Sequence, residues 1–425
     1  MMWYGMVAAV LAGAAAQDTL SLPAAIELGR SRAAAATVAR LGADIARVRV
    51  DQRRADLLPN VSGAGSVTRQ TVNLDAFGIP VASGVTDPFT ILSLQVRASQ
   101  TLVDPAAFAR LKATRDSVVA AGHDAVTAGA LAGAAAGVAF LRAIATEEAV
   151  GAREADSTVA ARLLDQARQL LDAGISTAID LTRSEVNFTA ARSALTVARN
   201  QRDRARLDLN RALNFPADTA VALASPGDLG TDGPDDPGAA VAFALEHRSE
   251  LAAERERLGV LRESRQAVRA ENLPSLGVNG TYTESGRKTG TLAGSYTAQL
   301  GLSVPIFDGF RRQKRSAELG LRIEAQEARL ADLEGQVATE TRQALLDLAT
   351  ARAQEVLAAD RARLAERELA QAEERFRAGV AGSIETTTAQ AGLVAARDAV
   401  IQARVALGIA GIAARRALGT LTAPR

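Results

Sequence analysis

The residue types that most often carry catalysis or bind metals are few and widely separated in this chain of 425 residues. The two histidines, His123 and His247, lack the close spacing of a metal site. Neither lies near a strand-to-helix turn, where a Ser-His-Asp triad would need its histidine. The absence of cysteine excludes disulfides, thiolate metal sites and a cysteine nucleophile. We therefore expect no enzyme, no bound metal and no cofactor.

Sequence patterns for nucleotide and nucleic-acid binding are also missing. Gly63-Ala64-Gly65 is followed by a strand continuation instead of a helix, so it does not fit a phosphate-binding loop. The formal net charge is +1 and 3% of residues are aromatic, so the chain lacks both a general positive field and a set of stacking rings. We expect no nucleic-acid partner.

Four short sequence patterns occur twice in the same order, which indicates a duplicated unit. The pairs are Leu58-Pro59-Asn60-Val61 with Leu273-Pro274-Ser275-Leu276, Thr101-Leu102-Val103-Asp104-Pro105 with Pro305-Ile306-Phe307-Asp308-Gly309, Asp172-Ala173-Gly174-Ile175 with Arg377-Ala378-Gly379-Val380, and Arg211-Ala212-Leu213 with Arg416-Ala417-Leu418. Their offsets are 215, 204, 205 and 205 residues. We expect a first repeat at 17–214 and a second at 239–425, joined by a linker at 215–238 rich in Pro, Gly and Asp.

Each repeat is expected to contain a helix, two strands, a very long helix and a final helix. The expected helices are 23–57, 105–172 and a last one to about 214, then 239–272, 310–377 and a last one to about 418; the expected strands are 59–72, 90–103, 274–285 and 296–307. A helix of about 68 residues would be roughly 100 Å long, far beyond the helices of an ordinary globular domain. Such lengths predict an extended helical architecture.

The second long helix carries a narrow apolar seam with coiled-coil-like spacing. Its members are Leu319, Ile323, Leu330, Leu333, Val337, Ala344 and Leu348. A narrow stripe predicts helices that pack side by side as a wall. Gly174 is expected to end its long helix in the left-handed conformation, and Ser383 is expected to cap the final helix.

The predicted strands alternate between apolar and polar residues and are long enough to cross an outer membrane on a tilt. The residues expected to face lipid are Leu92, Leu94, Leu276, Val278, Tyr282, Tyr296, Leu300 and Leu302. Alternation also occurs in half-buried sheets of soluble proteins. Four strands cannot close a membrane barrel alone, because eight is the usual minimum. If these strands span lipid, several chains must share one barrel.

The N-terminal segment 1–16 holds a short apolar run that ends in small residues before Gln17-Asp18, and it resembles a secretory signal. Its first five residues contain no Lys or Arg, so either the usual basic start is defective or the beginning of the sequence has been trimmed. No run of eighteen apolar residues occurs elsewhere. We therefore expect no helix to span a bilayer.

Taken together in order, these motifs resemble those of the TolC-like outer-membrane efflux family, and the resemblance covers essentially all of the chain after residue 16. It rests on the Leu-Pro entry to each hairpin, the strand exit at Pro305-Ile306-Phe307-Asp308-Gly309, and two tip sequences. The tips are Leu171-Asp172-Ala173-Gly174-Ile175-Ser176-Thr177-Ala178-Ile179-Asp180-Leu181 and Phe376-Arg377-Ala378-Gly379-Val380-Ala381-Gly382-Ser383-Ile384-Glu385-Thr386. Because the chain has no Cys, the lipid-anchored branch of the family is excluded.

The resemblance implies a mainly α fold with a small transmembrane β part. Each chain of a homotrimer would lend four strands to a twelve-stranded barrel in outer-membrane lipid, continued by a helical tube in the periplasm of a Gram-negative type cell. The linker 215–238 would lie at the equatorial region of the tube. The implied function is the passive exit duct of a tripartite efflux pump, with a periplasmic adaptor protein and an inner-membrane pump as partners.

The resemblance also implies roles for individual tip residues. Gly174, Ile175, Gly379 and Val380 would meet the adaptor, and Asp180 and Glu385 would line the pore constriction. Carboxylates in a narrow ring attract cations and disfavour anions, although an acid at the position of Asp180 also suits a helix N-terminus. Phe376 and Ala381 stand where family members often carry Tyr and Arg, so closure is expected to rest on packing or on Arg377 and Arg183.

Two alternatives stay open at this point. A type I protein secretion duct would have the same fold. A soluble, elongated coiled-coil scaffold would explain the helices and the Gly-capped hairpins. The scaffold would not explain four strand segments of membrane-crossing length or a signal-like N-terminus.

Overall fold

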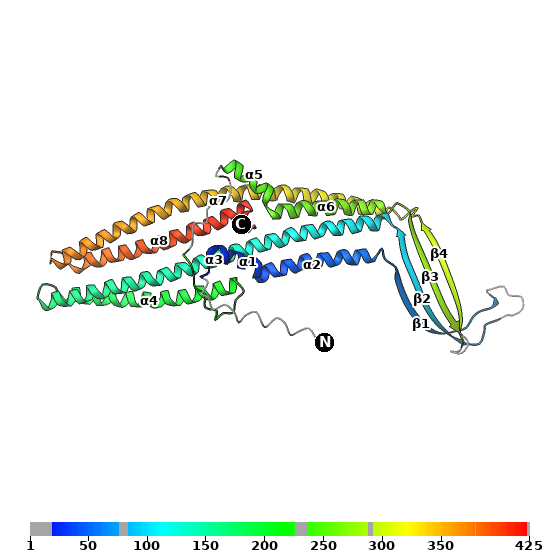
Figure 1. Cartoon of the computed structure of the whole chain (residues 1–425), viewed down its shortest axis with the longest axis horizontal. Helices are drawn as coiled ribbons and strands as arrows, with labels where there is room; N and C mark the ends of the chain where they lie inside the picture. The colour runs from blue at the N-terminus through cyan, green and yellow to red at the C-terminus, as the bar shows by residue number, and fades with distance from the viewer. Residues whose placement is uncertain are drawn as a thin grey trace. The chain divides into compact units, whose positions relative to one another are not determined.

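The computed structural model describes residues 19–75, 84–225, 234, 236–287, 292–378 and 380–422. The chain is mainly helical and carries one four-stranded sheet, so the predicted fold class is confirmed (Figure 1). The signal-like segment 1–16 lies outside the described residues, as do parts of the linker 215–238.

Contacts divide the chain into two compact units, and each unit contains parts of both repeats. Unit 1 comprises Met1–Leu41, His123–Ala252 and Asp332–Arg425, and unit 2 comprises Gly42–Gly122 and Ala253–Ala331. The long helices α3 and α7 each contribute residues to both units. The boundaries of the units therefore differ from those of the two sequence repeats.

The helices lie close to where the sequence places them. They are α1 (Leu22–Arg32), α2 (Ala34–Ala55), α3 (Pro105–Asp172), α4 (Ala178–Ala212), α5 (Pro237–His247), α6 (Ser249–Ala270), α7 (Arg311–Arg377) and α8 (Ser383–Leu418), followed by the short 3-10 helix η3 (Thr420–Thr422). The seam predicted on α7 is confirmed, because all seven of its residues are buried or half-buried.

The prediction of one unbroken helix before each hairpin is wrong. Ala33 separates α1 from α2 with ψ 143°, and Arg248 separates α5 from α6 with ψ 122°. The two breaks are 215 residues apart, the same offset as the duplicated Leu-Pro pairs. Arg248 is buried, and its guanidinium donates to Glu250 and Glu340, so the extended residue brings its side chain to these two acids.

The core of unit 1 is built where α1, α3, α4 and α8 meet. Its most buried members include Leu22, Ala25, Phe140, Leu209 and Ile412. Gly29 and Gly133 let α1 and α3 approach closely, because a Cβ on Gly29 would lie 2.4 Å from Ala136 Cβ. Small residues therefore set the spacing of the helices in this core.

By composition, one helix is more apolar than the sequence analysis expected. An 18-residue window of α3 reaches a mean hydropathy of 1.6. By length and composition, α3 is therefore long and apolar enough to cross a membrane. Of that window 44% is buried inside the structure. This window is not a run of eighteen apolar residues, so the expectation that no helix spans a bilayer stays a prediction.

The sheet of unit 2 has the order β1-β2-β3-β4, and all neighbouring strands are antiparallel. Its strands are β1 (Asn60–Gln70), β2 (Phe89–Val103), β3 (Ser275–Gly286) and β4 (Ala293–Ser303). All four predicted strands are present, although β4 ends before Pro305 instead of at Phe307. The central β2–β3 pair joins the hairpins of the two repeats, with a register shift between Thr101 and Val103.

Candidate functional site

The first helical hairpin turns at Gly174. Gly174 has φ +72°, a left-handed conformation that suits glycine, so the predicted helix C-cap is confirmed. The amides of Ile175 and Ser176 both donate to Leu170 O, at 2.9 and 3.1 Å, and these bonds close the end of α3. Ile175 is left exposed on the outside of the turn.

The second helical hairpin turns between α7 and α8. Val380 donates to Arg375 O at 3.1 Å and is exposed, like Ile175. Gly379, which the sequence places at the centre of this turn, lies outside the described residues. Ile179 and Ile384 are also exposed and occupy equivalent positions in the two repeats, 205 residues apart. Each tip thus presents two large apolar side chains; the sequence analysis did not single out Ile179 and Ile384, although the repeat offset relates them.

Asp180 connects the two tips. Its Oδ2 accepts hydrogen bonds from Thr177 Oγ1 at 2.6 Å and Thr177 N at 3.3 Å, which caps the N-terminus of α4. Its Oδ1 accepts from Ser383 Oγ at 2.5 Å and from Ser383 N at 3.3 Å, in the other repeat. These donors, the Ser383 hydroxyl first, hold the pKa of Asp180 well below its ordinary value. The helix-capping role and an inter-repeat link are therefore combined in one carboxylate.

Ser383 does not cap the final helix as the sequence predicted. The N-cap of α8 is Gly382, and Ser383 is the first helical residue, buried to 1% exposure. Its hydroxyl reaches Asp180 instead.

Glu385 is the counterpart of Asp180 in the second repeat but makes a different contact. Its Oε1 lies 3.1 Å from Arg375 Nε, so it joins α8 to α7 within one hairpin. Among the described residues Arg377 and Arg183 form no ion pair within the chain, and their expected part in closing the tip stays a prediction. Phe376 is buried, in agreement with closure by packing.

A row of polar side chains, the polar seam, runs along α8 from the tip. It faces helices α3 and α4 of the first repeat. Its α8 members are spaced by seven residues and are Ser383, Gln390, Arg397 and Arg404. A spacing of seven keeps these side chains on one face of the helix. The partners on α3 and α4 are Asp180, Asn187, Asp156 and Glu148.

Asp156 of α3 is the most buried carboxylate of this polar seam, with 4% exposure. Arg397 lies 3.1 Å from its Oδ1 and Arg153 lies 2.8 Å from its Oδ2. Arg153 also pairs with Asp398 of α8. Gln390 donates to Asp156 O and accepts from Asn187, which ties α8 to both α3 and α4. The hairpin between α7 and α8 is held differently, by an apolar cluster that includes Leu369, Ala372, Ala389 and Leu393.

The sheet register places most of the large apolar residues of the four strands on one face. Leu300 pairs with Val278, Leu302 with Leu276, and Tyr296 with Tyr282. Val96 of β2 lies opposite Tyr282, and the same face continues through Leu92 and Leu94. Directly paired residues of a sheet share a face, so the eight residues singled out from the sequence lie together. The opposite face carries mainly Ser, Thr, Asn and Gln side chains, together with Phe89, Ile91 and Arg97 of β2.

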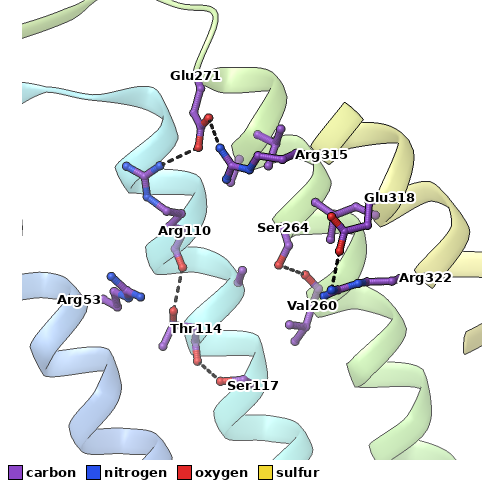
Figure 2. Close-up of a pocket in the computed structure, with 14 residues that line it drawn as sticks. Arg53, Arg110, Thr114, Ser117, Val260, Ser264, Glu271, Arg315, Glu318 and Arg322 are labelled. Carbon is purple, nitrogen blue, oxygen red and sulfur yellow. Dashed lines mark hydrogen bonds and ion pairs between the residues drawn. The ribbon is translucent and has the colours of Figure 1, made fainter. Parts of the chain in front are cut away.

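A cleft of about 430 Å³ in unit 2 is lined by paired charges. Figure 2 shows Arg110 and Arg315 reaching Glu271 from two helices, with Glu271 2.7 Å from Arg315. Arg322 pairs with Glu318 at 2.5 Å. Among the described residues no group of three His, Cys, Asp or Glu could hold a metal ion. His247 stacks on Phe243 in α5, and His123 lies in α3.

Comparison with known proteins identifies the family. The model of the family described as outer membrane efflux protein matches residues 26–214 and 241–420. The chain belongs to the outer membrane efflux protein family. The family and its fold are channels and not enzymes, and its members are outer-membrane proteins that extend into the periplasm. Membership also excludes the soluble scaffold.

Solved structures share the fold of this efflux-family chain. The Campylobacter jejuni CmeC outer-membrane channel is 15% identical with a TM-score of 0.80, over 94% of this chain and 85% of that one. The open state of the Neisseria gonorrhoeae MtrE outer-membrane channel is 19% identical with a TM-score of 0.74, over 94% of this chain and 88% of that one.

A sequence relative is Protein CyaE of Bordetella pertussis, which is 26% identical over 266 residues. The match covers 61% of this efflux-family chain and 56% of that protein, so it spans little more than half the length of the relative.

Homologous outer-membrane efflux channels are trimers that dock with adaptor proteins.

Proposed function

We propose that three copies of this chain form an outer-membrane duct through which small toxic compounds leave the cell. Energy would come from an inner-membrane pump, reached through a periplasmic adaptor protein. Family membership supports the outer-membrane setting, and the sheet supports the assembly.

The proposal rests on two features of the four-stranded sheet. The sheet has one apolar face, and both of its edge strands lack an outer neighbour. β1 and β4 end the sheet, and among the described residues neither has a second neighbour. In hydrocarbon an unpaired strand edge is not tolerated, so membrane strands must close into a barrel. Four strands are too few to close alone. Three copies would supply twelve strands, with the apolar face toward lipid.

The polar face of the sheet would line the pore, and the two faces can be tested separately. Leu300 and Gln299 are adjacent in β4 and point to opposite faces. An arginine on the lipid face of a membrane strand costs about 2–4 kcal/mol near the bilayer centre, whereas pore-facing changes alter selectivity.

We therefore expect Leu300→Arg to reduce the yield of folded trimer in the outer membrane, and Gln299→Arg to preserve the trimer but lower cation conductance. Trimer is measured by native mass spectrometry and conductance in planar bilayers. Equal yields of both variants, or a purified monomer of the parent chain, would contradict the shared barrel.

The helical tips would form the adaptor-binding part of the duct. Ile175 and Val380 are exposed at the two turns and would dock the adaptor, with Gly174 and Gly379 keeping the turns free of side-chain bulk. Asp180 and Glu385 would contribute carboxylates to a constriction that favours cations. The Asp180–Ser383 link would hold this constriction closed at rest.

A further inference from the structure

The region where strands meet helices in unit 2 carries unmatched positive charge. Residues 49–58, 104–112, 263–273 and 304–318 contain eleven Lys or Arg and seven Asp or Glu. All of these acids except Asp51 already pair with a cation. The pairs are Arg53–Asp56, Arg110–Asp104, Lys112–Glu263, Arg315–Glu271, Arg312–Asp308 and Arg322–Glu318. In the described part of the chain, no carboxylate lies within 4 Å of Arg54, Arg269, Arg311 or Lys314, all of them exposed.

Helix stability does not explain two of these four cations. Arg54 and Arg269 lie in the last turns of α2 and α6, where the helix dipole favours positive charge. Arg311 and Lys314 lie in the opposite place, at the start of α7, where the same dipole disfavours positive charge. Arg311 is attracted at longer range by Asp308, which already pairs with Arg312, so an anion from outside the chain could still bind these two cations.

Two exposed aromatic residues come just before Arg311 and Lys314 in the sequence. Phe307 is 72% exposed and Phe310 is 61% exposed, and their ring centroids are 5.4 Å apart in an edge-to-face arrangement. Phe310 has φ +65°, a left-handed conformation that is strained for a bulky residue. Strain kept at an exposed aromatic residue indicates a function for the ring. Aromatic rings with cations close by are typical of the membrane–water interface.

The apolar face of the sheet leads directly into this region. Leu300 and Leu302 of β4 are exposed, and Ile306 just before Phe307 is 92% exposed. We infer that a junction patch binds anionic phospholipid headgroups at the periplasmic surface of the outer membrane; it consists of Arg54, Arg269, Phe307, Phe310, Arg311 and Lys314. The rings would rest among the acyl chains near the headgroups, and the cations would contact the phosphates.

Lipid binding to the purified full-length trimer tests the junction patch. Native mass spectrometry would follow titration with phosphatidylglycerol or phosphatidylcholine in detergent. We expect the parent to prefer phosphatidylglycerol, and Arg311→Gln/Lys314→Gln to weaken that affinity by roughly ten- to thirtyfold, since each cation at a membrane surface contributes about fivefold. The matched control is Arg342→Gln/Arg352→Gln, which removes two exposed cations farther along α7 and should leave lipid affinity unchanged.

One further variant and a competition experiment separate headgroup binding from the alternative explanations. Phe310→Gly suits the left-handed backbone, so the variant should fold and bind phosphatidylglycerol less tightly; unchanged affinity would overturn the role of the ring. Competition by inorganic phosphate would show a free-anion site and overturn the headgroup assignment. Equal affinity for both lipids, or equal losses in test and control pairs, would overturn the patch as a whole. Because the readout is lipid binding, such a failure would leave the proposed duct untouched.

Discussion

Removing the hydroxyl of Ser383 should open the periplasmic tip. Ser383 Oγ lies 2.5 Å from Asp180 Oδ1, and the change to Ala deletes this inter-repeat hydrogen bond while leaving the Thr177 cap of α4 in place. The substitution is small and lies at a buried position, so we expect no other change at the tip.

The size of the effect follows from the contact. A hydrogen bond to a charged acceptor contributes about 1.5–3 kcal/mol. Asp180 is only half-buried, and solvent screening lowers the expected loss to about 1–1.5 kcal/mol per chain. If three chains open together, the losses sum to about 3–4.5 kcal/mol, which raises the ratio of open to closed channels on the order of 10² to 10³.

Single-channel recording in planar bilayers measures this ratio directly. Thr388→Ala is the matched control, because among the described residues its hydroxyl bonds only to Ile384 O of the same helix, at 2.8 Å. We expect long-lived open events for Ser383→Ala and parent-like traces for Thr388→Ala. If Ser383→Ala channels stay as closed as the parent, the link does not hold the tip.

Two further predictions concern the same end of the molecule. Because hydrogen bonds hold the pKa of Asp180 below its ordinary value of 3.8, the link is complete above that pH and is lost only as the pH falls below it. Open probability in bilayers should therefore stay constant from about pH 8 to pH 5 and rise under more acidic conditions; a rise near neutral pH would show that another group controls the tip. Separately, Ile175→Asp/Val380→Asp should abolish adaptor binding in pull-down assays and leave conductance intact, because both side chains are exposed at the turns. The control pair Val186→Asp/Leu364→Asp, exposed on the helix shafts, should bind the adaptor normally.

The long helices and the strands were predictable because their signals extend over many residues. α3 spans the predicted 105–172, since sustained helical periodicity and Pro105 fix its limits. The breaks at Ala33 and Arg248 were not predictable, because each involves a single extended residue and Ala is the strongest helix former. Tertiary contacts, such as the ion pairs of Arg248, decide the conformation there.

The Asp180 link could not be read from the sequence for a similar reason. Thr177 of the first repeat corresponds to Gly382 of the second. The next residue, Ala178, corresponds to Ser383. The two repeats therefore place their hydroxyls one residue apart, and the acids that follow them behave differently. Local capping rules predicted that Ser383 would serve its own helix, whereas the fold turns its hydroxyl toward the other repeat. Only the spatial proximity of the two tips reveals the pairing.

The chemistry of the interfaces indicates which of them separate when the tip opens. Buried polar partners can exchange their hydrogen bonds for water, whereas an exposed apolar surface has no such replacement. Opening should therefore part the polar seam of α8 and leave the apolar contact between α7 and α8 intact.

The lack of native cysteine makes this testable by crosslinking. Asn187→Cys/Gln390→Cys joined by a short thiol crosslinker should keep channels closed even when Ser383→Ala is added, because the crosslink spans the seam. Ala372→Cys/Ala389→Cys lies within the apolar cluster of the α7–α8 hairpin, so its crosslink should leave opening unaffected. The reverse pattern would mean that the hairpins, and not the repeats, move apart.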